Sequence, residues 1–528
     1  MKIANWRTTE EKEIREISAE IDGFRLWYRL PVSYRASRAG DPFVAAALLP
    51  SMARGESLEV DPPLSVSPRL LKNLMIIQEI QHAWNPIFKI IPIHATASPA
   101  APLNTGTLSF FSGGVDSTYT FLKHVNEITH VVFIQGFDFY GRRGQSSAVS
   151  LDDLCDLTQL VYKLSFGCDP VSAFLKGALS ASTRQALSES QDPSSDLSAL
   201  EEALVSDLNR ILSGPSIYDA KRFGGIKLRP ETEDALSQNV RGENAAGLNR
   251  LLLEDAYPLE IARDRNLAYR AAIERNTRFV RGQGKTLIPV ETNHFAFGYR
   301  YNLSRNLTQG SALASIALLL SFPRVYVPAA LAYDQLAPLG SHPLTDPRWS
   351  NDAVTIIHDG AEARRVDKVT KIAGSASALA NLRVCLGDMN SNCGRCVKCL
   401  RTMIPLQLLG AAGAPFPSYP LRAAVRKINI VNDIERTFFQ ENLELAERTD
   451  EGGLRKTLAA CLRRYERVQL LRDIERVIFG GRIKRAYQRL KKARGGIYRI
   501  DASPANNGAG FRSAGHSESH RRSRVPRA

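Results

Sequence analysis

The clearest pattern along the chain begins near residue 108, where short apolar runs start to alternate with amphipathic, helix-like segments. A short apolar run bounded by polar turns is typical of a buried strand, and strand–helix–strand alternation predicts a parallel sheet. Pro289 lies inside one of these runs, where a proline indicates a strand end or an irregularity. The predicted strands are Leu108–Phe111, Val131–Ile134, Thr286–Val290, Val325–Val327 and Val354–Ile357.

The chain around this alternation divides into further regions. Residues 1–100 are predicted to form a mixed α/β region, and residues 101–410 hold the alternating strands and helices. A polar, Ser-rich stretch at 141–258 predicts a helical insertion into that alternation. Residues 411–498 are predicted to be a charged helical extension, and residues 499–528 have too few apolar side chains to form a core, which predicts disorder.

Most of the excess positive charge lies at the C-terminal end of the sequence. The 528 residues are 44% hydrophobic and 23% charged, which is ordinary for a globular protein, and their formal net charge is +15. Residues 482–528 hold 13 Lys and Arg against 2 Asp and Glu, which leaves only +4 for the preceding 481 residues. We therefore favour a solubilising basic tail, with binding of nucleic acid or an anionic membrane as the alternative.

Cysteine usage and the N-terminus predict a cytoplasmic protein. The seven cysteines are odd in number and four of them crowd into 385–399, which is unlike a secreted disulfide framework. The first twenty residues carry charge where a signal peptide has an apolar core. The longest apolar run, Ala312–Phe322, is shorter than the ~20 residues that a membrane helix needs.

The strongest chemical signal is Ser-Gly-Gly-Val-Asp-Ser at 112–117, between the first predicted strand and a helix. Glycines let the backbone turn tightly, and the N–H groups of such a turn and of the helix N-terminus attract an anion. Ser112 and Ser117 can donate to phosphate oxygens, whereas Asp116 requires a bridging cation, which predicts Mg²⁺. The loop thus predicts a pyrophosphate cradle, and the alternative is a glycine turn without a ligand.

This motif resembles the signature of the PP-loop ATP pyrophosphatases, the adenine-nucleotide alpha-hydrolase-like superfamily. The resemblance implies an α/β fold with a doubly wound, Rossmann-like parallel sheet of the HUP type. It implies an enzyme that transfers AMP from ATP to a substrate oxygen and releases pyrophosphate. It also implies Mg²⁺ on Asp116 and adenine against the backbone of Ile134 and Gln135. The pyrophosphate would be held by Ser112, Gly113, Gly114, Val115 and Ser117.

A second motif carries four cysteines, and their density is that of a closed tetrahedral site. This favours structural Zn²⁺ in a metal-binding loop at 385–399, with an iron–sulfur cluster or unliganded thiols as alternatives. An iron–sulfur protein would be brown and a zinc protein colourless. The cysteines are Cys385, Cys393, Cys396 and Cys399.

The two motifs together, followed by Arg401, resemble the 7-cyano-7-deazaguanine synthases over about residues 105–410, the insertion excluded. These enzymes use ATP and ammonia to convert a carboxylate to a nitrile and have zinc at this position. Two departures lie in the substrate pocket: "TQGSALASIALLL" lacks the family's Arg-Asn pair, and "LGSHPLTDPRWS" replaces its Tyr-Pro-Asp-Cys-Arg stretch. We therefore expect a different substrate.

Where the substrate pocket departs from that family's pattern, other candidate site residues lie at the ends of predicted strands. His342 is predicted to act in acid–base chemistry, with Asp346 to orient it or to bind metal. Arg365 and Lys368 could reach phosphate, but their pattern is typical of a solvated helix face. Weaker candidates, also at strand ends, are Glu291, Asn293, His294, His358 and Asp359.

The predicted function is that of an ATP-dependent, AMP-forming ligase. It would adenylate a carboxylate or amide oxygen of a small-molecule or terminal-group substrate, and a nitrogen nucleophile would then displace AMP. One alternative is an RNA-modifying PP-loop enzyme, for tRNA thiolation or amidation, that holds RNA with the basic tail. The other is a non-catalytic ATP-binding scaffold.

Overall fold

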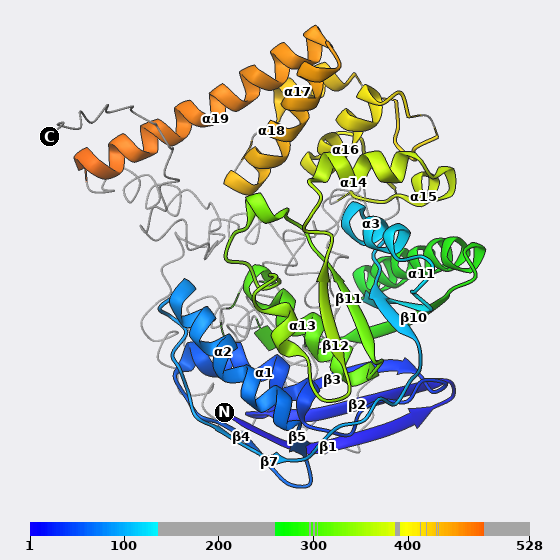
Figure 1. The fold of residues 1–528 in the computed structure, drawn as a ribbon, viewed down its shortest axis with the longest axis vertical. Helices are drawn as coiled ribbons and strands as arrows, with labels where there is room; N and C mark the ends of the chain where they lie inside the picture. The colour runs from blue at the N-terminus through cyan, green and yellow to red at the C-terminus, as the bar shows by residue number, and fades with distance from the viewer. Residues whose placement is uncertain are drawn as a thin grey trace, which may run out of the picture.

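The computed structural model describes most of the chain in a few long stretches (Figure 1). The predicted insertion at 141–258 and the predicted disordered tail at 499–528 lie outside the described residues, as does the extension beyond residue 479. The described residues are 1–135, 259–294, 297–298, 301, 303, 305–385, 391–411, 413–418, 420–428, 430 and 432–479.

A parallel sheet of five strands lies at the centre of the fold, in the order β12-β11-β8-β9-β10. Because β8 precedes both β9 on one side and β11 on the other, the strand order reverses between β8 and β11, as it does in doubly wound sheets. All five predicted strands are confirmed. Their bounds are Thr107–Phe110 for β8, His130–Gln135 for β9, Thr286–Thr292 for β10, Arg324–Pro328 for β11 and Thr355–Asp359 for β12.

Pro289 lies inside β10 and does not end it. The residue is in register with Phe133 of β9, whereas pairing on the other side of β10 starts only at Glu291. On the side away from β9, Pro289 therefore has no strand partner in the described sheet, and a missing N–H that faces this side costs no ladder hydrogen bond.

The N-terminal region extends this sheet. β1 (Lys2–Glu11), β2 (Ile14–Ile21) and β3 (Phe24–Pro31) form an antiparallel meander, and β3 joins β10 through Arg29 and Tyr28. β4 (Leu58–Val60) and β6 (Ile93–His94) continue the sheet beyond β1. Residues on both sides of position 100 share one hydrophobic core. The short strands β5 (Ser65–Val66) and β7 (Thr96–Ala97) pair separately.

Helices cover both faces of the sheet, and the alternation of strand residues shows which face each helix covers. Val325 and Val327 of β11 join the core beneath the first group of helices, and Tyr326 joins the core beneath the second group. The first group is α1 (Asp41–Arg54), α2 (Pro68–Trp84) and α13 (Arg305–Leu320). The second is α3 (Val115–Lys123), α11 (Leu259–Gly282), α14 (Arg365–Ala373) and α15 (Ala376–Asn381).

The predicted C-terminal extension is helical over its described part. It packs on α16 (Val397–Leu408), which supplies Leu400 and Ile404 to a separate apolar cluster. Figure 1 shows this bundle at the end of the molecule opposite the N-terminal meander. None of the helices in the described ranges is long and apolar enough to span a bilayer. The extension comprises α17 (Leu421–Lys427), α18 (Asp433–Arg448) and α19 (Gly452–Phe479).

Candidate functional site

The Ser-Gly-Gly-Val-Asp-Ser loop joins the end of β8 to the start of α3, beside the point where the strand order reverses. Two hydroxyls organise it: the backbone N–H of Ser112 donates to Ser117 Oγ over 3.1 Å, and the two Oγ atoms lie 3.2 Å apart. Gly114 is the N-cap of α3 and, having no side chain, makes no side-chain cap hydrogen bond; its own N–H donates to Ser112 Oγ over 3.3 Å. The first amides of α3 are thus left for an anion, which the helix dipole also favours.

Gly113 is required by the loop's geometry. Its φ of +75° lies in the left-handed region, and a Cβ at this position would meet Asn276 Oδ1 at 2.8 Å. Its carbonyl accepts from the backbone N–H of Arg383 over 2.8 Å. The loop is therefore held in one shape by contacts from α11 and from the segment that leads to the cysteines.

Asp116 is the acidic member of the loop, and two buried cations of α14 contact it. Arg365 Nη2 lies 2.7 Å from Oδ2, and Lys368 Nζ lies 3.3 Å from Oδ1 and donates to Ala329 O over 2.6 Å. Burial alone would raise the pKa of Asp116, but Arg365, Lys368 and Arg401 outweigh it and hold that pKa below its usual value. The interpretation of Arg365 and Lys368 as a solvated face was wrong: they are 6% and 1% exposed.

Arg401 adds a third cation from α16. Burial, and then the charge of Arg365, lower the pKa of Arg401 to about 9. The Nε atoms of Arg365 and Arg401 are buried and have no hydrogen-bond partner within the described part of the chain. Three cations therefore converge on one carboxylate, and this excess of positive charge and of free donors suits a polyanion.

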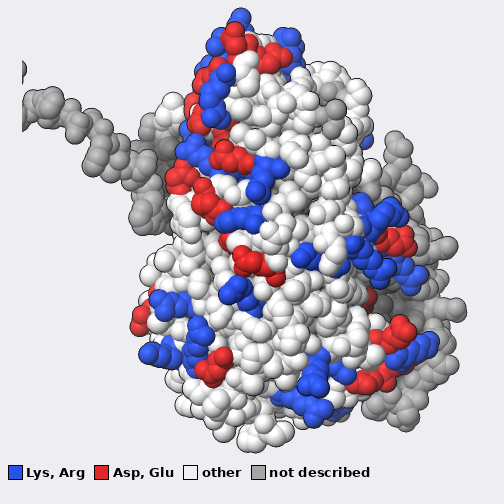
Figure 2. All heavy atoms as spheres, turned by 45° about the vertical axis from the view of Figure 1, so that its right-hand side comes forward, with Lys and Arg blue, Asp and Glu red and all other residues white. Residues whose placement is uncertain are grey.

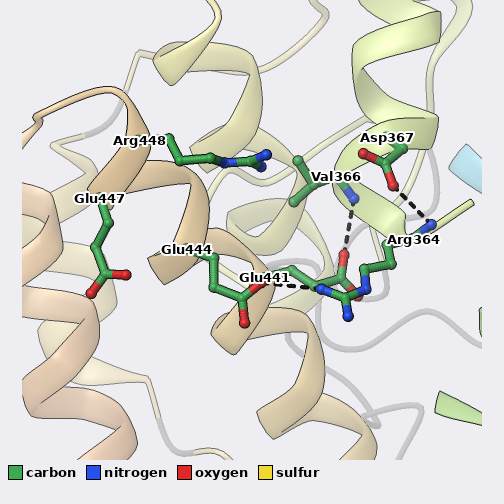
Figure 3. A pocket seen from close by; sticks show the side chains of 7 residues that line it. All are labelled: Arg364, Val366, Asp367, Glu441, Glu444, Glu447 and Arg448. Atoms are coloured by element: carbon green, nitrogen blue, oxygen red, sulfur yellow. Dashed lines mark hydrogen bonds and ion pairs between the residues drawn. The ribbon is translucent and has the colours of Figure 1, made fainter. Parts of the chain in front are cut away.

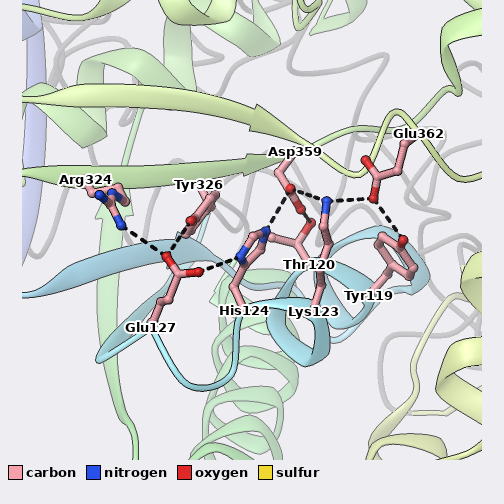
Figure 4. A network of polar contacts seen from close by, with 9 residues as sticks. All are labelled: Tyr119, Thr120, Lys123, His124, Glu127, Arg324, Tyr326, Asp359 and Glu362. Carbon is pink, nitrogen blue, oxygen red and sulfur yellow. Dashed lines mark hydrogen bonds and ion pairs between the residues drawn. The ribbon is translucent and has the colours of Figure 1, made fainter.

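Asp359, at the end of β12, ties α3 to the neighbouring edge of the sheet (Figure 4). Its carboxylate accepts from Thr120 Oγ1, Lys123 Nζ and His124 Nε2 over 2.8 to 2.9 Å. Burial would raise the pKa of Asp359, but the hydrogen bonds from Lys123, His124 and Thr120 lower it. Asp359 was predicted as a weak site candidate, and its contacts are those of a residue that anchors α3.

His342 and Asp346 lie in a polar cluster that is separate from the Ser-Gly-Gly-Val-Asp-Ser loop. Asp346 Oδ2 lies 2.7 Å from His358 Nδ1, whereas His342 Nδ1 accepts from the backbone N–H of Leu344 over 3.1 Å. Burial, and then the charge of His358, lower the pKa of His342. Because successive strand residues alternate, His358 lies on the face of the sheet opposite Asp359 and α3. Asp346 thus pairs with His358, and the predicted acid–base role of His342 stays a prediction.

Ile134 and Gln135 end β9 beside the loop. β8 pairs with β9 only as far as Val132, whereas β10 pairs with β9 through Gln135. The ladder between β8 and β9 therefore ends before Ile134, and the predicted adenine contact with the backbone of Ile134 and Gln135 stays a prediction.

The four cysteines meet in a compact set. Their Sγ atoms all lie within 4.8 Å of one another, with 3.9 Å between Cys385 and Cys396 and 4.0 Å between Cys393 and Cys399. Four sulfurs at the Zn–S distance in a tetrahedron lie about 3.8 Å apart. An iron–sulfur cluster places its own iron and sulfide atoms between the thiolates and needs a wider set. The geometry fits a single metal ion such as zinc.

Backbone N–H groups donate hydrogen bonds to these sulfurs, as they could to metal-bound thiolates. The N–H groups of Cys393, Cys396 and Cys399 each donate to the Sγ of the preceding cysteine over 3.4 Å. The hydrogen bond with Cys396 is the main reason why the pKa of Cys385 rises to about 11. A bound divalent ion would hold these sulfurs as thiolates.

Two residues of the loop that sequence reasoning missed hold it in place. Asn392 is buried, accepts from the backbone N–H groups of Val384 and Cys385, and donates to two carbonyls. Gly394 has a φ of +69°, and a Cβ there would meet Pro417 at 2.8 Å. Only the cysteine–glycine pair in "NCGRC" hinted at such a turn.

Comparison with known proteins places the chain in no family: no family model matches it, and no curated protein or solved structure matches it either. Its class is therefore defined by fold and site alone. It is a Rossmann-like α/β protein with a glycine loop at the reversal of strand order and a four-cysteine cluster that could bind a metal ion.

Proposed function

We propose that the protein is a PP-loop type, AMP-forming ligase that adenylates a carboxylate or amide oxygen and releases pyrophosphate. The observation that carries the proposal is the convergence of Arg365, Lys368 and Arg401 on the loop at the reversal of strand order. Open α/β sheets bind their ligands at this point. The excess of buried cations over carboxylates suits the phosphates of ATP.

In this proposal the substrate oxygen attacks the α-phosphorus, the bond to the bridging oxygen breaks, and pyrophosphate leaves with the electron pair. Ser112, Ser117 and the first amides of α3 bind the pyrophosphate, and the three cations stabilise the charge that develops on it. A nitrogen nucleophile then displaces AMP. Asp116 is the carboxylate that would hold Mg²⁺, which supplies further charge neutralisation when it is bound.

On the face that Figure 2 presents, the distribution of charge favours a small-molecule or terminal-group substrate. Figure 2 shows basic and acidic side chains interspersed over much of the face that it presents, with a gathering of basic ones at mid-height near its right-hand edge. A protein that grips RNA along its surface needs a continuous basic track. We also propose a cytoplasmic location, single-ion zinc at the cysteines, and a supporting role for that metal.

The test follows ATP by phosphorus NMR with Mg²⁺ and, separately, the small-molecule, RNA and protein fractions of a cell extract. We expect AMP and pyrophosphate with the small-molecule fraction, or with the protein fraction if the substrate is the terminal group of a protein. Ser117→Ala removes a loop hydroxyl and should abolish the turnover. Ser311→Ala is the matched control, because Ser311 is an equally buried serine whose Oγ donates within α13.

Each other outcome changes the proposal. Turnover with the RNA fraction alone would replace it with an RNA-modifying enzyme, and ATP binding without turnover would leave a non-catalytic role. Turnover that survives in Ser117→Ala as it does in Ser311→Ala would refute the role of the loop. A protein that binds neither ATP nor pyrophosphate would refute the proposal as a whole.

A further inference from the structure

One aromatic ring of the C-terminal extension contacts two of the three cations. Phe438 of α18 is 4% exposed, and the guanidinium carbons of Arg401 and Arg365 lie 4.3 Å and 4.8 Å from its ring centroid. The two arginines come from different helices, α16 and α14. A guanidinium over an aromatic face is attracted by the ring's quadrupole, more strongly when both are removed from water.

One turn further along α18, the side chain of Glu441 contacts the start of α14. Glu441 Oε2 accepts from the backbone N–H of Val366 over 3.0 Å, and Oε1 accepts from Gln335 Nε2 over 2.7 Å. Figure 3 shows Glu441 pointing from α18 to Val366. Beyond this contact the two helices border an open groove of about 610 Å³, and there Glu444 pairs with Arg364 at the solvent-exposed side. Glu441 is therefore the buried contact that sets the position of α14 against α18.

These contacts offset the electrostatic repulsion between Arg365 and Arg401. The charge of Arg365 lowers the pKa of Arg401, so the two guanidiniums repel each other. Of these two arginines only Arg365 contacts Asp116 directly, and the charges of Asp116 and Glu435 act on Arg401 in the opposite direction. Phe438 gives both a common apolar and polarisable surface, and Asn442 Nδ2 donates to Arg401 O over 3.3 Å to hold the backbone behind it.

We propose that α18 is part of the anion site, and that Phe438 and Glu441 are positioning residues that hold Arg365 and Arg401 for the pyrophosphate group. This inference rests on the proposed function and deepens it. It assigns a role to the extension that follows the sheet, which otherwise reads as a separate helical bundle with its own core.

The experiment measures inorganic pyrophosphate and Mg-ATP binding by calorimetry with the full chain. Phe438→Leu keeps an apolar side chain and removes the ring, and we expect the Kd for pyrophosphate to rise about tenfold. The matched control is Phe439→Leu, because Phe439 is 0% exposed and packs in the core of the extension, away from both arginines. We expect that control to lose stability but to keep the Kd of the unaltered protein.

A second pair of variants keeps the inference testable if Phe438→Leu does not fold. Phe438→Met retains most of the buried volume without the ring, and Glu441→Gln retains the shape without the charge. Both should raise the Kd for pyrophosphate and reduce the stabilisation that pyrophosphate confers against urea. If the unaltered protein binds neither probe, the proposed function fails. If it binds both and the Phe438 and Glu441 variants bind equally well, only this inference fails.

Discussion

Replacing Asp116 by Asn removes the carboxylate that Arg365 and Lys368 contact directly and whose pKa Arg401 also lowers. Arg365 and Lys368 contact it at 2.7 Å and 3.3 Å, and both are buried. Breaking a buried ion pair from one side costs about 3–5 kcal/mol, because the other charge is left without a counterion. The Asp116 side chain is 25% exposed and Lys368 keeps its bond to Ala329 O, so we expect a loss near the lower end, about 3 kcal/mol.

The assay is urea unfolding at several pH values, with Asp334→Asn as the control. Asp334 also pairs with an arginine of this segment, Arg364, but the pair is 45% to 49% exposed, so its loss should cost less than about 1 kcal/mol. The pKa of Asp116 is lowered by folding, so its contribution is fully present above the unfolded pKa of about 3.9 and is lost as the pH falls through the folded value. The difference between the parent protein and Asp116→Asn should be constant near neutral pH and shrink below about pH 4.

Asp116→Asn should lower the stability but raise the affinity for pyrophosphate. Without Mg²⁺, Asp116→Asn should bind pyrophosphate more tightly than the parent protein, because no carboxylate competes for Arg365 and Lys368. With Mg²⁺ the advantage should disappear, because the variant lacks the carboxylate for the metal. Equal stability of the two proteins at pH 7, or weaker Mg-free binding by the variant, would refute the argument that Asp116 is the counterion of this cluster.

Three further predictions follow from the contacts. Gly113→Ala should cost about 2 kcal/mol in urea unfolding, from the left-handed backbone and the contact with Asn276, and should abolish pyrophosphate binding; normal binding would contradict the cradle. Cys396→Ser should lower soluble yield and bound zinc in metal analysis, and a stable, metal-free variant would contradict a structural metal. Asp359→Asn should cost about 2–3 kcal/mol at pH 7, with the difference shrinking below about pH 4 because folding lowers the pKa of Asp359; a pH-independent difference would exclude the ion pair with Lys123.

The features that sequence reasoning predicts well are local in the chain. The loop at 112–117 and the four-cysteine loop at 385–399 each hold their groups within a short stretch, so spacing alone indicates the chemistry that they could perform. The five parallel strands can be predicted equally well, because each is a mainly apolar run, as is typical of a strand buried on both faces. Asn392 escaped notice because a buried amide that orders a loop has no pattern of its own.

The cationic cluster could not be predicted in this way. Arg365 and Lys368 lie 249 and 252 positions from Asp116, and they meet it only because β11 and β12 lie beside β8 in the sheet. Their spacing along α14 fits a solvated face equally well, since helical periodicity cannot tell which neighbour a face meets. The continuation of the sheet into the N-terminal meander depends likewise on one long-range strand pairing, of β10 with β3, through Arg29 and Tyr28.

A single helix links the four-cysteine set to the cationic cluster. Cys396 is the N-cap of α16, and its sulfur accepts from the N–H of Cys399. Arg401 follows Cys399 by two residues, on another side of the same helix. A side chain two positions from a metal ligand on a rigid helix cannot keep its place if that ligand moves. A metal ion bound by these thiols would therefore act on the proposed anion site without touching it, because it would fix where the Arg401 guanidinium meets Arg365, Phe438 and Asp116. In that proposal the cysteines, α16 and α18 together support the cluster of like charges.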